Sequence, residues 1–125
     1  MKKIINTPKA PQAIGPYSQA IEFNNMVFTS GVIPINPETG ELVTGSIEEQ
    51  AERVLLSLTN LLEAAGSSAD KVIKTTVFIK NMNDFAKVNE VYSKYFTKDC
   101  PARSCVEVAR LPKDVLIEVE AIAYK

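Results

Sequence analysis

The stretch SIEEQAERVLLSLTNLLEAAGSSADKVIKTTVFI, residues 46–79, contains the helix and the strand that decide the fold. Ser46 followed by Glu49 is a capping box, in which a hydroxyl and a carboxylate satisfy unpaired backbone N–H groups. After it, apolar residues recur every three or four positions, which predicts an amphipathic helix of about five turns that ends at Gly66. Residues 72–79 are β-branched and aromatic, which predicts a strand.

The rest of the chain is expected to add five strands and one helix. The second helix is expected between Phe85 and Phe96, where aromatic and apolar residues fall on one face. Asn24-Asn25 is expected to form a hairpin turn, because Asn tolerates left-handed backbone. The order βββαβαββ predicts one α+β domain over residues 1–125, with two layers: a mixed sheet packed against two helices. The expected strands are 2–6, 19–24, 26–33, 103–109 and 116–124.

The composition excludes several classes of chemistry. The chain has no histidine, so Ser-His-Asp or Cys-His catalysis and His-ligated metal sites are excluded. Two cysteines, Cys100 and Cys105, cannot alone complete a tetrahedral zinc site. The net charge of −1 disfavours nucleic acid as the main partner. No run approaches the roughly 20 apolar residues of a membrane helix, and the first residues do not match a signal peptide, so a cytoplasmic protein is expected.

Polar side chains alternate along the last two expected strands. Arg103 and Cys105 project to one face of the first, and Glu118 and Glu120 to one face of the second. The short turn between the strands suggests antiparallel pairing, with both polar faces side by side and away from the helices. Such a face is either an exposed surface with structural ion pairs, or a face covered by another subunit, with the charges lining a cleft.

Several motifs, in this order, resemble the RidA family, also called the YjgF-type or reactive intermediate deaminases. The resemblance covers almost the whole chain. Val32 departs from the family pattern, because many members carry Gln at this position. The difference is expected to alter the detail of the pocket. The motifs are AIGPYSQA (13–20), VFTSG (27–31), NDF (83–85), NEVY (89–92), PARSCVEVA (101–109), LPKD (111–114) and EVEA (118–121).

The resemblance implies a fold similar to chorismate-mutase-like trimers, in which three sheets form an inner barrel and the helices lie outside. It places three active sites in the clefts between neighbouring subunits. The implied reaction is that of a 2-iminobutanoate/2-iminopropanoate deaminase, which hydrolyses imines and enamines released by pyridoxal-phosphate dehydratases to 2-keto acids and ammonia. It implies no cofactor and no metal.

By the resemblance, Arg103 holds the substrate carboxylate, because a guanidinium offers two parallel donors that match it. The alternative is a structural ion pair with Glu107, Glu118 or Glu120. Glu118 is expected to activate the attacking water or to carry a proton to the leaving amine. Burial would raise the pKa of Glu118 and a nearby Arg103 would lower it. Glu120 is expected to be a surface carboxylate.

Five further residues are candidates for substrate contacts. Tyr17 resembles the aromatic residue that closes the pocket from an adjoining subunit, with simple packing as the alternative. Ser30 and Gly31 are expected to contribute backbone or hydroxyl contacts. Cys105 is expected to contribute backbone groups; a nucleophilic thiol is disfavoured because the chain has no histidine to act as its base. Asn89 is either a polar contact or an exposed helix residue.

Two other functions remain open at this point. An endoribonuclease or translation inhibitor is an activity also ascribed to some family members, although the net charge argues against it. A trimer that binds keto acids without turnover, or acts like a chaperone, would use the same Arg103 cleft.

Overall fold

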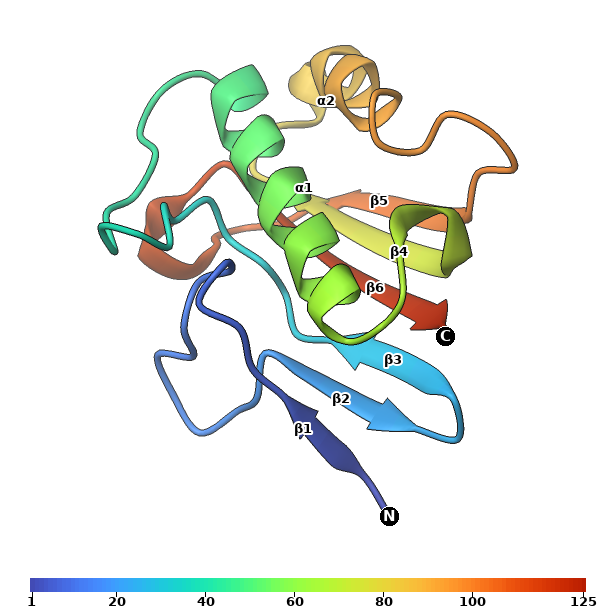
Figure 1. Ribbon diagram of the computed structural model, residues 1–125. Helices are drawn as coiled ribbons and strands as arrows, with labels where there is room; N and C mark the ends of the chain where they lie inside the picture. Colours follow the sequence, from blue (N-terminus) through green and yellow to red (C-terminus); the bar gives the residue numbers. More distant parts are fainter.

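A six-stranded mixed sheet with two helices against one face makes up the computed structural model, which describes residues 1–125 (Figure 1). The elements are β1 (Lys3–Ile5), β2 (Ala20–Phe23), β3 (Met26–Thr29), α1 (Ile47–Ala64), β4 (Val72–Ile79), α2 (Phe85–Tyr92), β5 (Ala102–Glu107) and β6 (Ile117–Tyr124). The strands lie in the order β1-β2-β3-β6-β4-β5. The predicted α+β class and element order are confirmed. None of the helices combines the length and the hydropathy that a membrane span requires.

Helix α1 begins and ends where the sequence predicts. The Ser46 hydroxyl accepts a hydrogen bond from the Glu49 N–H at 3.2 Å, which satisfies one of the free donors of the first turn. The chain leaves the helix through Gly66, whose φ of +84° suits a residue without a Cβ. The second helix is shorter than expected, because α2 ends at Tyr92 and the chain turns, with the Tyr95 N–H bonded to the Tyr92 carbonyl.

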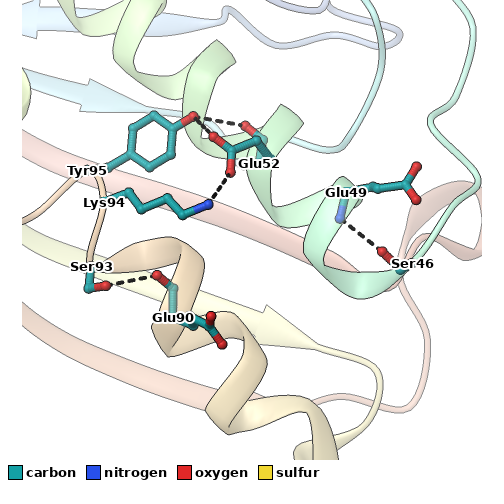
Figure 2. Close-up of polar contacts among 7 residues, drawn as sticks. All are labelled: Ser46, Glu49, Glu52, Glu90, Ser93, Lys94 and Tyr95. Carbon is teal, nitrogen blue, oxygen red and sulfur yellow. Dashed lines mark hydrogen bonds and ion pairs between the residues drawn. The ribbon is translucent and has the colours of Figure 1, made fainter.

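Side chains from the segment after α2 bind to α1. The Tyr95 hydroxyl donates to the Glu52 carboxylate at 2.6 Å, and the Lys94 ammonium lies 3.5 Å from the same carboxylate (Figure 2). Figure 2 also shows the Ser46 cap at the start of α1 and the Ser93 hydroxyl bonded to the Glu90 carbonyl. These contacts fix the segment that leads from α2 toward β5.

Strand β4 lies between β5 and β6, which corrects the predicted pairing of the last two strands. β5 runs parallel to β4, and β6 runs antiparallel to β4 on its other side. The short turn at residues 108–116 therefore does not close a hairpin. An antiparallel pair would have left β4 without its second neighbour, whereas the observed order gives it hydrogen-bonding partners on both sides.

The hairpin between β2 and β3 forms as predicted. Asn24 and Asn25 have φ angles of 49° and 64°, as a two-residue turn between right-twisted strands requires. The third strand is shorter than the expected range 26–33, and β3 ends at Thr29. After it only Val32 returns to the sheet, through a bridge to Val119.

The main core lies between the helices and the sheet. It contains the buried apolar residues of α1 and the alternate residues Ile117, Val119, Ala121 and Ala123 of β6. This is the apolar face that the sequence predicts for the last strand.

The opposite face of the sheet has no helix over it. Its side chains are largely apolar, and several are between 40% and 63% exposed. A sheet face this apolar resembles the interior of an assembly more than a solvated surface. The exposed apolar residues on it are Ile4, Phe23, Phe28, Val106 and Tyr124.

Candidate functional site

A hollow of about 310 Å³ opens where the uncovered sheet face meets the loops after β1 and β3. It brings four of the predicted site residues together: Tyr17, Ser30, Gly31 and Glu118. The remaining wall is formed by three apolar residues, Ile14, Ile33 and Pro112.

The Glu118 side chain reaches across to Gly31. Val32 and Val119 exchange two hydrogen bonds, at 2.8 and 3.1 Å, in an antiparallel bridge, so Gly31 and Glu118 lie diagonally across that bridge. A Cβ on Gly31 would lie 2.0 Å from a carboxylate oxygen of Glu118. Glycine is therefore required here for close approach, and the Glu118 carboxylate occupies the space that a side chain would fill.

The Glu118 carboxyl has its pKa raised above the ordinary value. Burial is the main cause, because it disfavours the charged form, and the nearby Glu120 carboxylate adds to it. Arg103 does not oppose this shift. Glu120 itself is exposed, as expected for a surface carboxylate.

The loop that carries Tyr17 is tied to the end of β3. The Ser30 hydroxyl donates to the Ser18 carbonyl at 2.6 Å, and the Ser30 N–H donates to the Gln19 carbonyl at 2.9 Å. Both hydrogens of Ser30 are thus used within the protein, so its hydroxyl can accept from a ligand but not donate. The Tyr17 ring is 48% exposed at the rim, and its hydroxyl accepts from the Ile14 N–H at 3.2 Å.

Gln19 is a supporting residue that the sequence analysis missed. Its side chain is 6% exposed and bonds four backbone atoms: the Thr7 N–H and the carbonyls of Thr7, Ala10 and Pro11, at 2.7 to 3.2 Å. It therefore fastens the loop that forms one wall of the hollow. Only its place in the motif AIGPYSQA could have indicated it.

Arg103 lies on the helical face of the sheet, which corrects the predicted position beside Glu118. Arg103 is paired with Thr75 of β4, whose side chain is fully buried under the helices, whereas Glu118 is paired with Phe78 on the other face. Paired residues of neighbouring strands project to the same face. One chain therefore does not bring Arg103 and Glu118 to a common ligand.

The guanidinium of Arg103 lies over two aromatic rings of α2. Its central carbon is 4.7 Å from the ring centre of Tyr92 and 5.4 Å from that of Phe85. Arg103 makes no ion pair within the chain, so the structural pairs considered for it do not form. Asn89 is half-buried on the same stripe of α2, one turn from each ring.

Neither cysteine has the surroundings of a nucleophile. Burial raises the pKa of the Cys105 thiol, an effect that Arg103 only partly offsets, and the side chain packs against the main core. Cys100 is exposed and lies 3.3 Å from the Phe96 carbonyl. No three Cys, Asp or Glu side chains gather in a way that could hold a metal ion.

The chain matches known proteins over its whole length. The family model described as Endoribonuclease L-PSP matches residues 7–125. A RutC family protein of Pyrococcus abyssi is 60% identical, with 99% of this chain and 98% of that protein covered. The 2-iminobutanoate/2-iminopropanoate deaminase of Escherichia coli is 53% identical, with 100% and 99% covered.

The fold matches as closely as the sequence. The crystal structure of E. coli TdcF with bound serine has a TM-score of 0.94 and 51% identity, with 98% of each chain covered. The chain therefore belongs to the family that the Endoribonuclease L-PSP model describes, the one that its motifs indicate as RidA or YjgF-type.

Proposed function

We propose that this protein hydrolyses 2-imino acids to 2-keto acids and ammonia. The observation that carries the proposal is the half-buried Glu118 carboxylate, with its raised pKa, on the wall of a hollow shared with Tyr17, Ser30 and Gly31. A carboxylate with a pKa closer to neutral is a more effective general base. The E. coli relative named as a 2-iminobutanoate/2-iminopropanoate deaminase supports the same reaction.

The chemistry requires one base and one orientated substrate. Glu118 removes a proton from a water molecule, whose oxygen bonds to the imine carbon while the C=N π electrons move to nitrogen. The same carboxyl then delivers that proton to the amine nitrogen. The carboxylate next takes the proton of the new hydroxyl, the C–N bond breaks as the C=O bond forms, and the released ammonia carries this proton away as ammonium. A protonated imine is already electrophilic, so positioning contributes much of the rate, and neither a cofactor nor a metal is needed.

The substrate carboxylate is bound by Arg103 of a second chain. Within one chain Arg103 and Glu118 lie on opposite faces of the sheet, and Arg103 has no acidic partner. The apolar uncovered face supports an assembly in which sheets pack together, and a homotrimer places a β5 edge beside the hollow of its neighbour. Cys105, two residues from Arg103 on that edge, contributes backbone groups, and Asn89, on the same stripe of α2 as the two stacked rings, adds a polar contact.

The hollow suits a small aliphatic substrate. Ile14 and Ile33 offer apolar contacts to a short side chain, and Tyr17 covers the opening. The relative TdcF holds serine in its crystal structure, which supports a ligand of amino-acid size with a carboxylate. The 2-imino acids that dehydratases release from threonine and serine have this size.

A coupled assay tests the proposal. Threonine dehydratase is supplied with threonine, and 2-ketobutyrate formation is recorded with and without the protein. We expect faster formation with the wild type and none of the acceleration with Arg103→Ala. Arg103→Lys should also lose most of it, because an ammonium cannot donate two parallel bonds. No acceleration by the wild type over several amino-acid precursors would contradict the proposal.

The family description keeps an endoribonuclease activity as a second candidate. The net charge of −1 weighs against RNA binding. The two activities respond differently to salt, because RNA affinity falls steeply with ionic strength and the turnover of a small imine does not. Proteins that contact several phosphates lose RNA affinity steeply between about 50 and 200 mM salt. RNA cleavage that declines over this range would therefore favour the endoribonuclease activity.

A further inference from the structure

The Arg103 guanidinium is held by stacking alone. It lies over the rings of Tyr92 and Phe85, with ring centres at 4.7 and 5.4 Å from its central carbon. No ion pair engages it, and the Glu107 carboxylate, four residues further along β5, accepts from the Met82 N–H at 2.8 Å. Cation–π contact uses the face of a guanidinium and leaves the N–H donors along its edge free.

The Tyr92 ring is itself fixed from two directions. Its hydroxyl is hydrogen-bonded to the Thr75 hydroxyl at 2.8 Å, and both side chains are buried, with exposed fractions of 7% and 0%. Thr75 is the direct neighbour of Arg103 across β4 and β5. The Phe96 ring packs against Tyr92 with the ring centres 4.6 Å apart. The same strand pair thus positions both the cation and the ring beneath it.

We propose that Tyr92 and Phe85 are positioning residues that present the edge of Arg103 to a ligand carboxylate. This inference rests on the proposed function, because it assigns the carboxylate of the 2-imino acid to that edge. The rings orient the guanidinium before the substrate arrives, and they do so without an acidic partner that would compete with it. Phe85 is 39% exposed and Arg103 is partly buried, so the stacked guanidinium lies close to the surface of the chain.

The two rings should affect substrate binding rather than the chemical step. A residue that helps to hold the carboxylate acts equally on the bound substrate and on the transition state, so its loss raises KM and leaves kcat in place. We expect Phe85→Leu to raise KM about threefold to tenfold, the range of a partly exposed cation–π contact. Tyr92→Leu should raise it further. Phe85→Tyr keeps an aromatic ring under the guanidinium, so its KM should equal that of the wild type.

Val88→Ala provides the matched control. Val88 lies on the same helix and is 1% exposed, so its truncation destabilises α2 without touching the guanidinium. We expect a lower Tm and an unchanged KM. A purely structural role of Phe85 or Tyr92 would produce this same pattern in their leucine variants, which would overturn the inference.

A spectroscopic readout separates this inference from the proposed function. The Arg103 Nε–H resonance, assigned by its absence in Arg103→Lys, should be shifted upfield by the rings and should return toward ordinary values in Phe85→Leu. Titration with 2-ketobutyrate should move it in the wild type. If the wild type does not accelerate imine hydrolysis, the deaminase proposal fails while the shift still reports the stacking. An unshifted resonance, or a KM unaffected by either leucine variant, would overturn the role of the rings.

Discussion

At the residue scale, Gly31 is the position where a single methyl group should disable the site. A Cβ there would meet the Glu118 carboxylate at 2.0 Å, and the carboxylate would have to move. Gly31 does not have a positive φ, so alanine fits its backbone. We expect Gly31→Ala to fold normally and to lose about 100-fold in kcat/KM, the order of magnitude for a catalytic group displaced by about 1 Å. The coupled assay and a thermal melt measure the two effects.

Gly45→Ala is the control for this change. A Cβ on Gly45 would meet the Glu49 carboxylate at 2.2 Å, a conflict of the same size far from the hollow. Glu49 is exposed and can swing away, so activity should be retained. Equal losses in both variants would show that the Gly31 effect does not come from Glu118.

The raised pKa of Glu118 also predicts a dependence of stability on pH. The folded protein holds this proton more tightly than the unfolded chain, so the contribution to stability is fully present below the unfolded pKa and is lost as pH rises through the folded one. At neutral pH the half-buried Glu118 charge is therefore destabilising. Glu118→Gln should melt at a higher temperature than the wild type at pH 7, and the difference should shrink below about pH 4. A variant that is less stable than the wild type at pH 7 would contradict this account.

At the element scale, local patterns predict the helices and strands better than their pairing. The Ser46 N-cap, the 3.6-residue periodicity of α1 and the alternation of residues 116–124 each reflect a local cause, and all three are confirmed. The capping box forms only in half, because the Glu49 carboxylate does not bond the Ser46 N–H in return. The pairing of β5 with β6 was wrong, because a short connection favours a hairpin only when no other strand competes for the edge. β4, which precedes both, takes the place between them.

The candidate site was predictable in its members and not in its division between two faces. The motifs indicate Tyr17, Ser30, Gly31 and Glu118, which the fold brings into one hollow. Alternation along β5 predicts which of its residues share a face. It does not predict whether that face points toward the helices, because this depends on the strand that β5 pairs with. Pairing with β4 puts Arg103 on the helical side. The rings beneath it come from another element and leave no signal along β5.

Gln19 provides a test of how the loop at residues 7–18 is held. Replacing it by leucine leaves the Thr7 N–H and three carbonyls without their partner, which should destabilise the protein by about 1–3 kcal/mol. The loop should open before the rest unfolds, so limited proteolysis should cut within it first. Urea denaturation and mass mapping of the fragments measure both.

Gln50→Leu is the comparison for Gln19. Gln50 is also buried and bonds the Gly45 carbonyl and the Leu116 N–H, so it anchors a different loop. Its leucine variant should lose stability on a similar scale without early cleavage at residues 7–18. Equal cleavage of the loop at residues 7–18 in both variants would show that Gln19 does not hold this loop specifically.

At the scale of the whole molecule, the uncovered sheet face predicts assembly. Phe28 is 40% exposed near the middle of that face, between Ile21 and Ile122 of the neighbouring strands. A carboxylate buried there would be strongly unfavourable. We expect the wild type to be a trimer and Phe28→Glu to be monomeric by light scattering. Leu56→Glu, at an equally exposed position on α1, should remain trimeric.

Because Arg103 and Glu118 lie on opposite faces of one chain, a site shared between two chains can be tested by mixing variants. Arg103→Ala and Glu118→Gln are each expected to be inactive. When the two are unfolded together and refolded as mixed trimers, sites that combine an intact Arg103 from one chain with an intact Glu118 from the next should form in about one quarter of the clefts. We expect the mixture to recover about that fraction of wild-type imine hydrolysis in the coupled assay. Mixed trimers that assemble normally and recover nothing would contradict a site shared between chains.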